Sequence, residues 1–189
     1  MDLVAAISGR RTIRFYQQRP VEKEKLFNLI EAARMAPSAA NAQPLRYVVV
    51  MQPELVAKLF AVTKWAGRVT PRRTPQAGVN APPVFLAITC KANTDPQVDA
   101  GSAIAHLVLS AYAQGLGCCW IGAFDHAAAD LILGLSENVR TLYLVAVGYP
   151  AEKPVRDDIP ATGNVGYYLD NDDILHVPKY TVDALTEWR

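Results

Sequence analysis

The sequence lacks an excess of charge of either sign. Its 19 lysines and arginines are nearly balanced by 18 acidic residues, which leaves a net charge of +1 at pH 7. So small a net charge gives no long-range attraction to nucleic acid or to an anionic membrane. Arginines do gather locally, but without the interleaved aromatic side chains that nucleic-acid binding favours. We therefore expect neither nucleic acid nor a membrane as a partner.

Cysteine and histidine are also scarce, with three residues of each. Cys118 and Cys119 are adjacent, and neighbouring cysteines rarely pair because the ring that they would close is strained. No spacing of Cys and His fits a zinc site. These observations predict no metal site and buried, reduced thiols, and hence a cytoplasmic protein. Residues 1–8 form too short a stretch for a signal peptide.

Charge is missing almost entirely from a long internal stretch. Between Asp99 and Asp125, only His106 can carry a charge. Apolar residues crowd the first half and polar ones recur every three or four positions, which predicts a helix buried nearly all round except for one polar stripe. Two glycines then end the helix, and a short apolar strand follows at 118–124. Because these glycines and a tryptophan interrupt the stretch, we reject a membrane span.

The remaining hydrophobic periodicity predicts alternating helices and strands in one domain that covers residues 1–189. Helices are expected at 2–9, 22–34, 54–62 and 125–133, the last capped by Asp125, and strands at 46–51, 84–89 and 140–148. The 46–51 strand has the sequence of a strand buried on both faces. Prolines and acids from residue 151 onward predict an extended tail (151–189) without a core of its own, lying across the body or a partner subunit.

Two stretches carry polar groups in patterns suited to a ligand. Arg10, Arg11 and Arg14 surround Thr12. Guanidiniums can bind a phosphate with paired hydrogen bonds, although a solvated basic arm is the alternative. Residues 37–44 combine small side chains, two amides and a hydroxyl between prolines. That composition suits the edge of a planar polar heterocycle, and a plain turn has the same composition.

A second basic run contains Lys64, Arg68, Arg72 and Arg73. It belongs to the 64–80 connection, which at 17 residues is long for a compact domain and shows no clear periodicity. We expect this connection to be either a mobile lid or a disordered excursion. Its arginines and lysine leave open whether it recognises a phosphate, an acidic substrate or nothing.

Together these stretches resemble the nitroreductase family of FMN-dependent oxidoreductases, as a small member. The resemblance spans nearly the whole chain, and Asp99 at the start of the uncharged helix also fits. It rests on four stretches in the family's order: RRTIR at 10–14, PSAANAQP at 37–44, GLGCCWIG at 115–122 and GYPAEKP at 148–154. The resemblance implies an α+β fold with a mixed, mainly antiparallel sheet flanked by helices. It also implies a homodimer in which the C-terminal tail wraps the partner and two FMN sites lie at the subunit interface.

The resemblance assigns roles to individual residues, none of them catalytic, because the flavin N5 carries the chemistry. The residues implied to contact the ribityl phosphate and the pyrimidine edge are Arg10, Arg11, Thr12 and Arg14. Those implied to come from the other subunit are Pro37, Ser38, Ala39, Asn41 and Gln43, and those along the isoalloxazine edge are Ile121, Gly122 and Ala123. Small family members often carry a basic pair in the tail for the phosphate. Here Lys179 is followed by Tyr180, so Lys179 alone can serve.

The activity implied by the resemblance is that of an NAD(P)H-dependent oxidoreductase. NADH or NADPH would deliver hydride to the flavin, leave, and be replaced by a nitroaromatic, a quinone or a similar oxidant, in a ping-pong mechanism. Arg14 is expected beside the N1–O2 edge, where a positive charge favours the reduced ring. The alternative is a non-catalytic flavin-binding protein, a store or sensor, in which the 64–80 connection covers the ring. The histidines and cysteines are expected to be structural, and Tyr112 and Trp120 are expected to pack in the core.

Overall fold

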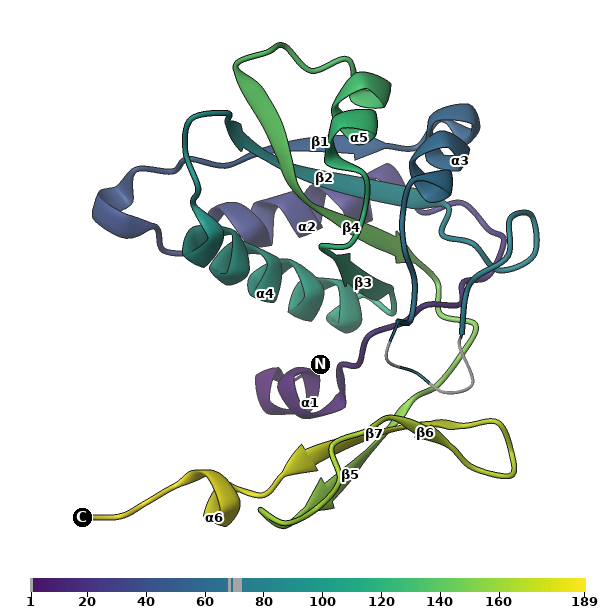
Figure 1. The fold of residues 1–189 in the computed structure, drawn as a ribbon, viewed down its shortest axis with the longest axis vertical. Coiled ribbons are helices and arrows are strands. Elements are labelled where there is room, and N and C mark those ends of the chain that lie inside the picture. The colour runs from purple at the N-terminus through teal and green to yellow at the C-terminus, as the bar shows by residue number, and fades with distance from the viewer. Residues whose placement is uncertain (1, 68, 70–72) are drawn as a thin grey trace.

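A four-stranded antiparallel sheet forms the centre of the fold in the computed structural model, which describes residues 2–67, 69 and 73–189. The strand order is β1-β2-β4-β3 (Figure 1). The strands are Arg46–Val50 (β1), Val84–Lys91 (β2), Gly117–Ile121 (β3) and Val139–Gly148 (β4). The sheet and the helices around it confirm the predicted fold class. The strand predicted at 118–124 lies slightly earlier in the chain than expected.

The two central strands, β2 and β4, are buried on both faces of the sheet, which explains their nearly continuous apolar sequences. Side chains alternate between the faces with period two. In β2, Val84, Leu86 and Ile88 belong to one buried cluster, whereas Phe85 and Ala87 belong to the other. A sheet with two apolar faces requires a helical layer on each of them.

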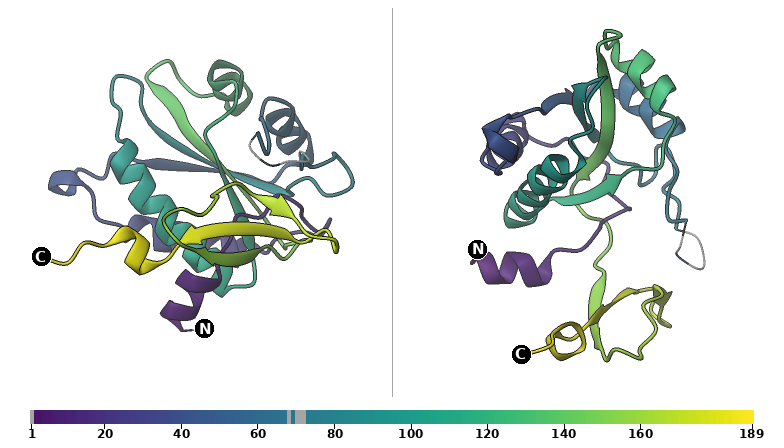
Figure 2. Two further views of the ribbon diagram at one scale, coloured as in Figure 1. Left: turned by 60° about the horizontal axis from the view of Figure 1, so that its bottom comes forward. Right: turned by 60° about the vertical axis from the view of Figure 1, so that its left-hand side comes forward.

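Helices supply these two layers (Figure 2). They are α2 (Lys23–Arg34) and α4 (Gln97–Ala113) on one face, and α3 (Pro53–Ala61) and α5 (His126–Leu133) on the other. Leu29 of α2 and Leu107 of α4 are fully buried in the first cluster, and Leu59 of α3 and Ala129 of α5 in the second.

The ends of α5 follow local sequence signals. The carboxylate of Asp125 accepts a hydrogen bond from the Ala128 N–H at 3.0 Å, which confirms the predicted cap. Gly134 follows the helix in the left-handed conformation, with φ of 64°. Among the residues that the structure describes, no helix is long and apolar enough to cross a membrane.

Three expectations about burial are wrong. The outward side of α4 is exposed, with Val98 at 87% and His106 also exposed, because α4 packs against the sheet and α2 on its other side. Trp120 is 44% exposed and packs edge-on against Tyr143, with 5.1 Å between ring centroids, instead of lying in the core. Only Val50 of β1 is buried, because β1 is an edge strand that pairs with β2 alone in its sheet.

The tail forms a second sheet beyond the N-terminal helix α1 (Leu3–Gly9) (Figure 1). Its elements are β5 (Val155–Ile159), β6 (Tyr168–Leu169), β7 (Leu175–Tyr180) and the short helix α6 (Val182–Leu185). β7 pairs in parallel with β5 and antiparallel with β6. Leu175 and Val177 point to the same face of β7 and form a small buried cluster with Val69 of the 64–80 connection. The tail therefore packs against a residue from outside it rather than around a core of its own.

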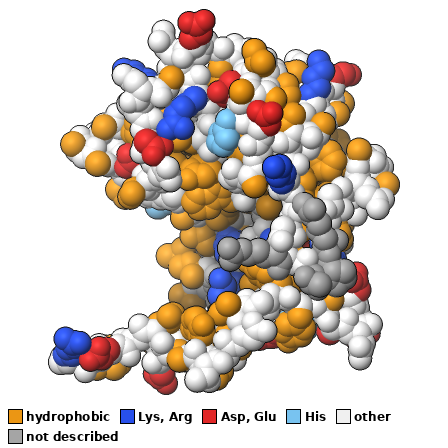
Figure 3. Space-filling model, viewed as in Figure 1, with side chains coloured by type: hydrophobic (Ala, Val, Ile, Leu, Met, Phe, Trp, Pro, Cys, Tyr) orange, Lys and Arg blue, Asp and Glu red, His pale blue; other side chains and the backbone are white. Residues whose placement is uncertain are grey.

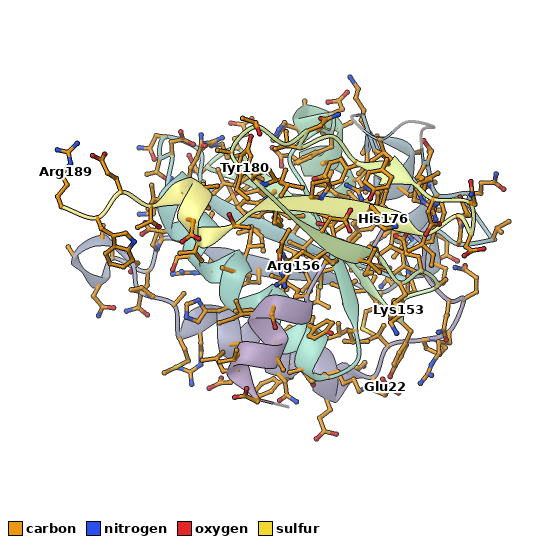
Figure 4. All side chains as sticks on the ribbon, turned by 90° about the horizontal axis from the view of Figure 1, so that it is seen from below. Glu22, Lys153, Arg156, His176, Tyr180 and Arg189 are labelled. Atoms are coloured by element: carbon orange, nitrogen blue, oxygen red, sulfur yellow. The ribbon has the colours of Figure 1, made fainter. Side chains whose placement is uncertain are left out.

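His176, which lies on β7 in the tail (Figure 4), joins the three strands of the tail sheet through two carboxylates. Its Nδ1 lies 2.9 Å from the carboxylate of Asp157 on β5, and its Nε2 lies 3.2 Å from Asp170 after β6. The ring stacks on Tyr168, whose hydroxyl donates to Asp157 at 2.7 Å. Because both ring nitrogens face acceptors, the imidazolium is the form that satisfies this site. Hydrogen bonds to Asp157 and then Asp170 raise the pKa of His176 above its ordinary 6.5.

We expect the tail sheet to lose stability as the pH rises through the raised pKa of His176. A raised folded-state pKa contributes stability that is fully present below pH 6.5 and is lost once the folded imidazolium deprotonates. Amide hydrogen exchange of β7, measured together with the NMR titration of His176, tests this. In His176→Gln, the protection factors of the β7 amides, which correct for the intrinsic pH dependence of exchange, should vary less across this pH range. A His176 pKa at or below 6.5 would contradict the prediction.

Candidate functional site

The N-terminal segment 10–17 lies between the edge of β3 and the chain that leaves β4. On one side, Thr12 bridges to Cys118 and the Ile13 N–H donates to the Cys118 carbonyl at 3.0 Å. On the other side, the Phe15 carbonyl accepts from the Ala151 N–H at 2.8 Å. The segment is therefore fixed by backbone hydrogen bonds to both of its neighbours.

Two glycines of the predicted site stretches allow this close approach. A Cβ on Gly117 would lie 2.5 Å from Cγ1 of Ile13, and a Cβ on Gly148 would lie 2.8 Å from the ring of Tyr16. Any side chain at either position would push segment 10–17 away from the sheet. The glycines of the 115–122 and 148–154 stretches thus position the arginines of the 10–14 stretch.

Successive side chains of the extended segment point to opposite sides, so Arg10, Thr12 and Arg14 lie on one side of it. Arg10 and Thr12 line a pocket of about 420 Å³ together with Trp120 and the outward side of α4. Arg14 lines a neighbouring pocket of about 280 Å³, which also includes Trp120 and residues 121–123. The structure therefore brings Arg10, Thr12 and Arg14 to two pockets that meet at Trp120, together with the predicted Ile121, Gly122 and Ala123.

Arg11 lines neither of these pockets. Its Nη2 donates to the Ser8 carbonyl at 2.8 Å and its Nη1 donates to the Arg10 carbonyl, so its guanidinium binds the C-terminal end of α1. Burial, and then the neighbouring Arg10, lower the pKa of Arg11. Its position follows from the alternation, which turns residues 11 and 13 away from Thr12 and Arg14.

The 37–44 stretch lies at the opposite end of α4, around the short 3₁₀ helix η1 (Ala39–Asn41) (Figures 1 and 2). The Ala39 N–H donates to the Asp99 carboxylate at 3.1 Å, at the first turn of α4. Tyr112, near the last turn of α4, touches α1 instead. Thirteen residues of helix separate these two contacts, or about 20 Å at 1.5 Å per residue. None of residues 37–44 lines either of the two pockets beside segment 10–17.

The backbone of the 37–44 stretch has an unusual conformation. Ala40, Asn41 and Gln43 have φ values of 50°, 52° and 47°, in the left-handed region that residues other than glycine rarely adopt. Such strain persists where the surrounding structure enforces it, and it clusters at ligand sites. The side chains of Asn41 and Gln43 are exposed, and the Ser38 hydroxyl accepts from the Gln43 N–H at 3.0 Å. The predicted amides are thus presented outward on a constrained loop.

Lys179, the predicted phosphate contact of the tail, is exposed on β7 and lines none of the pockets just described. The arginines Arg68 and Arg72 of the second basic run lie outside the described residues. Lys64 lines the pocket that contains Arg14. The described part of the 64–80 connection therefore forms one wall of the predicted site.

A buried ion pair beneath segment 10–17 was not foreseen from the sequence. Nη2 of Arg73 lies 3.4 Å from Oε2 of Glu152, and the two side chains are only 8% and 6% exposed. Arg73 also lies over the Phe15 ring, at 4.6 Å from its centroid, and binds Asp173 at 3.1 Å. The guanidinium of Arg73 therefore binds groups of the protein itself and lines neither of the two pockets. The one signal in the sequence was Glu152, an acid within the proline-rich 148–154 stretch.

The cysteines next to the site are protonated side chains of the core. Cys118 and Cys119 lie on opposite faces of the sheet, in different buried clusters, as the predicted strand requires. Burial raises the pKa of both thiols, that of Cys119 to about 11. All three cysteines are free and buried, which confirms the expectation of buried thiols. At neutral pH neither of the adjacent thiols supplies a nucleophilic thiolate.

Comparison with known proteins identifies the family. A relative from Methanothermobacter thermautotrophicus, whose name includes NAD(P)H nitroreductase, is 29% identical over 84% of this chain and 83% of its own. The FMN reductase [NAD(P)H] of Bacillus subtilis is 26% identical over 95% of this chain and 80% of its own. The crystal structure of nitroreductase A from Vibrio parahaemolyticus has a TM-score of 0.69 at 26% identity, covering 92% of this chain and 80% of that one. The nitroreductase family model matches residues 7–149, so the chain belongs to the nitroreductase family.

Proposed function

We propose that this chain transfers hydride from NADH or NADPH, through a bound FMN, to a nitroaromatic, a quinone or a similar small acceptor by a ping-pong mechanism. NAD(P)H-dependent oxidoreduction follows from the family and from the names of the relatives. The observation that carries the finer proposal is the alignment of Arg10, Thr12 and Arg14 along two pockets that meet at Trp120.

The donors and the space fit FMN. Arg10 and Thr12 offer a guanidinium and a hydroxyl, which suit a phosphate. The adjoining pockets, about 420 and 280 Å³, have apolar walls from α4 and β3 and few polar groups, as sites for flat cofactors do. When bound, FMN supplies the hydride chemistry, because its ring accepts and releases hydride at N5.

The residues of this chain would bind and orient the cofactor. Arg10 and Thr12 would hold the phosphate, whereas Arg11 stays bound to the end of α1. Arg14 would place its positive charge at the N1–O2 edge of the ring. Gly122 is exposed at the end of β3, and its backbone N–H would face N5, flanked by Ile121 and Ala123.

A second copy of the chain would complete the site, because no residue of the 37–44 stretch lines either of the two pockets within one chain. Figure 3 shows the molecule hollowed between the body and the tail, with hydrophobic side chains lining the hollow. Large apolar side chains are exposed on α1, on α4 and after β7: Leu3, Val4, Ile7, Val98, Val182, Leu185 and Trp188. We propose a homodimer in which the partner contributes its Pro37–Gln43 loop and its tail with Lys179. The three free thiols fit the reducing conditions of the cytoplasm.

The absorption spectrum of the purified protein tests the activity first. We expect flavin bands that bleach within the mixing time on anaerobic addition of NADPH or NADH and return when a quinone is added. Bands that persist with both donors would favour the non-catalytic flavin-binding protein. A protein without flavin bands, even after reconstitution with FMN, would refute the proposed cofactor.

Arg14→Ala should lower the midpoint potential of the bound flavin. Removing a positive charge beside the ring destabilises the negative charge of the reduced form, and a loss of 1–3 kcal/mol corresponds to roughly 20–60 mV for a two-electron couple. Arg14→Lys, which keeps the charge, serves as the matched control, and its midpoint potential should stay close to that of the wild type. Equal potentials in the wild type and Arg14→Ala would show that the charge lies elsewhere.

Mixed dimers test whether each site is built from two chains. Arg10→Ala/Arg14→Ala and Asn41→Ala/Gln43→Ala should each bind FMN weakly as homodimers. In a purified heterodimer of these two variants, one site combines the substituted segment of one chain with the substituted loop of the other, and the second site carries no substitution. It should recover about half of the wild-type FMN capacity, as expected for an isologous dimer. Heterodimers of two differently tagged copies of one variant should recover none. If each site belonged to one chain, the mixed dimer would also recover none.

A further inference from the structure

Glu152 lies buried beneath the peptide that carries Arg14. It follows β4 by four residues and its side chain is 6% exposed. Its Oε1 accepts a hydrogen bond from the Arg14 N–H and a second from the Phe15 N–H at 3.1 Å. One carboxylate oxygen thus binds two successive backbone N–H groups of segment 10–17.

These two N–H groups fall in a gap of the backbone hydrogen bonding. The Ile13 N–H donates to Cys118, the Tyr16 N–H donates to Asn80 at 3.0 Å, and the segment then continues on the chain leaving β4. Arg14 and Phe15 lie between these bonds, where the segment passes from β3 to the 149–151 stretch. A partly buried peptide N–H without an acceptor is costly, and among the described residues the edge of the sheet offers these two N–H groups no carbonyl. The carboxylate of Glu152 supplies the missing hydrogen-bond acceptor.

Arg73 compensates the charge that this arrangement buries. Its Nη2 lies 3.4 Å from Oε2 of Glu152, and within the described residues neither that oxygen nor Nε of Arg73 has a hydrogen-bond partner. The charge of Glu152 therefore depends on Arg73, and removal of Arg73 would leave a buried carboxylate uncompensated. Arg73 also stacks on Phe15 and binds Asp173 of the tail, which locates the pair between segment 10–17, the 64–80 connection and the tail.

We infer that Glu152, with Arg73 as its counter-ion, is the positioning residue for Arg14 in the flavin site. The inference rests on the proposed FMN site. The Arg14 side chain is long and flexible, and its guanidinium enters the pocket beside Gly122 because the backbone at residue 14 is fixed. Glu152 is not among the residues that line the pocket of Gly122 and lines a separate pocket with Arg10 and Arg11, so it acts on Arg14 through the peptide that it binds.

The test compares Glu152→Ala, Glu152→Gln, Arg73→Met and the double variant Arg73→Met/Glu152→Gln with Leu29→Ala. Leu29 is fully buried in the cluster between the sheet and helices α2 and α4, so its variant controls for a general loss of stability. Two measurements are made: the FMN dissociation constant, and the ¹H–¹⁵N amide shifts of Arg14 and Phe15 in the FMN-free protein. Neither measurement depends on turnover.

We expect Glu152→Ala to raise the FMN dissociation constant by roughly ten- to a hundredfold and to shift both amide signals, as loss of a supporting partner does at other cofactor sites. Glu152→Gln retains an oxygen acceptor, so its FMN dissociation constant should rise less than that of Glu152→Ala. The double variant removes both charges but keeps that acceptor, so it should bind FMN more tightly than Arg73→Met alone. Leu29→Ala should stay within about twofold of the wild type, because its lesion lies outside the pockets.

Two results would overturn the inference while leaving the proposed function intact. One is a Glu152→Ala protein that binds FMN as tightly as Leu29→Ala. The other, which still decides the matter if Glu152→Ala does not fold, is a double variant that binds FMN no better than Arg73→Met. A wild-type protein that binds no FMN would instead refute the proposed function, and the inference with it.

Discussion

Burial of β2 and β4 on both faces is the constraint on which the rest of the structure depends. It requires a helical layer on each face and leaves only the sheet edges to form further backbone hydrogen bonds. At one edge, β3 pairs with Thr12 and Ile13, so the N-terminal segment continues the sheet. A segment held in this way is extended, and extended chains present alternate residues to opposite sides. The grouping of Arg10, Thr12 and Arg14 follows from that geometry.

Helix α4 then adjoins both parts of the proposed site. Its first turn binds the 37–44 loop through Asp99, and its outward side and last turns adjoin segment 10–17. No residue of the loop lines either of the two pockets of its own chain. The loop holds three residues in the left-handed conformation, and the segment presents guanidiniums to two pockets. A second copy, related by a two-fold axis, is the economical way to unite them.

The sequence was sufficient for the fold class and for nearly all the elements, and it singled out Arg10, Thr12, Arg14 and residues 121–123, which line the two pockets. It succeeded because glycines, prolines and buried strands follow local rules, as Asp125 at the start of α5 illustrates. It could not separate Arg11 from its neighbours, because the side to which a residue points depends on the pairing of Thr12 with Cys118. Nor could it pair Arg73 with Glu152, since charges so far apart in the sequence meet only through the fold. The exposure of Trp120 likewise depends on what covers β3.

The pairing of Arg73 with Glu152 changes how the charge of the site is understood. Counted from the sequence, both basic runs surround the pocket with positive charge. In the structure, the charge of Arg73 is cancelled by Glu152 and Asp173, and Arg11 is turned to the end of α1. The described cations that line the two pockets are then Arg10, Arg14 and Lys64. In the proposed site these three would lie at the phosphate end, at the ring and on the outer wall, so each would act on a different part of a bound cofactor or substrate. A cation that is neither neutralised nor buried exerts its field where it is exposed, so the proposal assigns the charge selectivity of the site to these three residues.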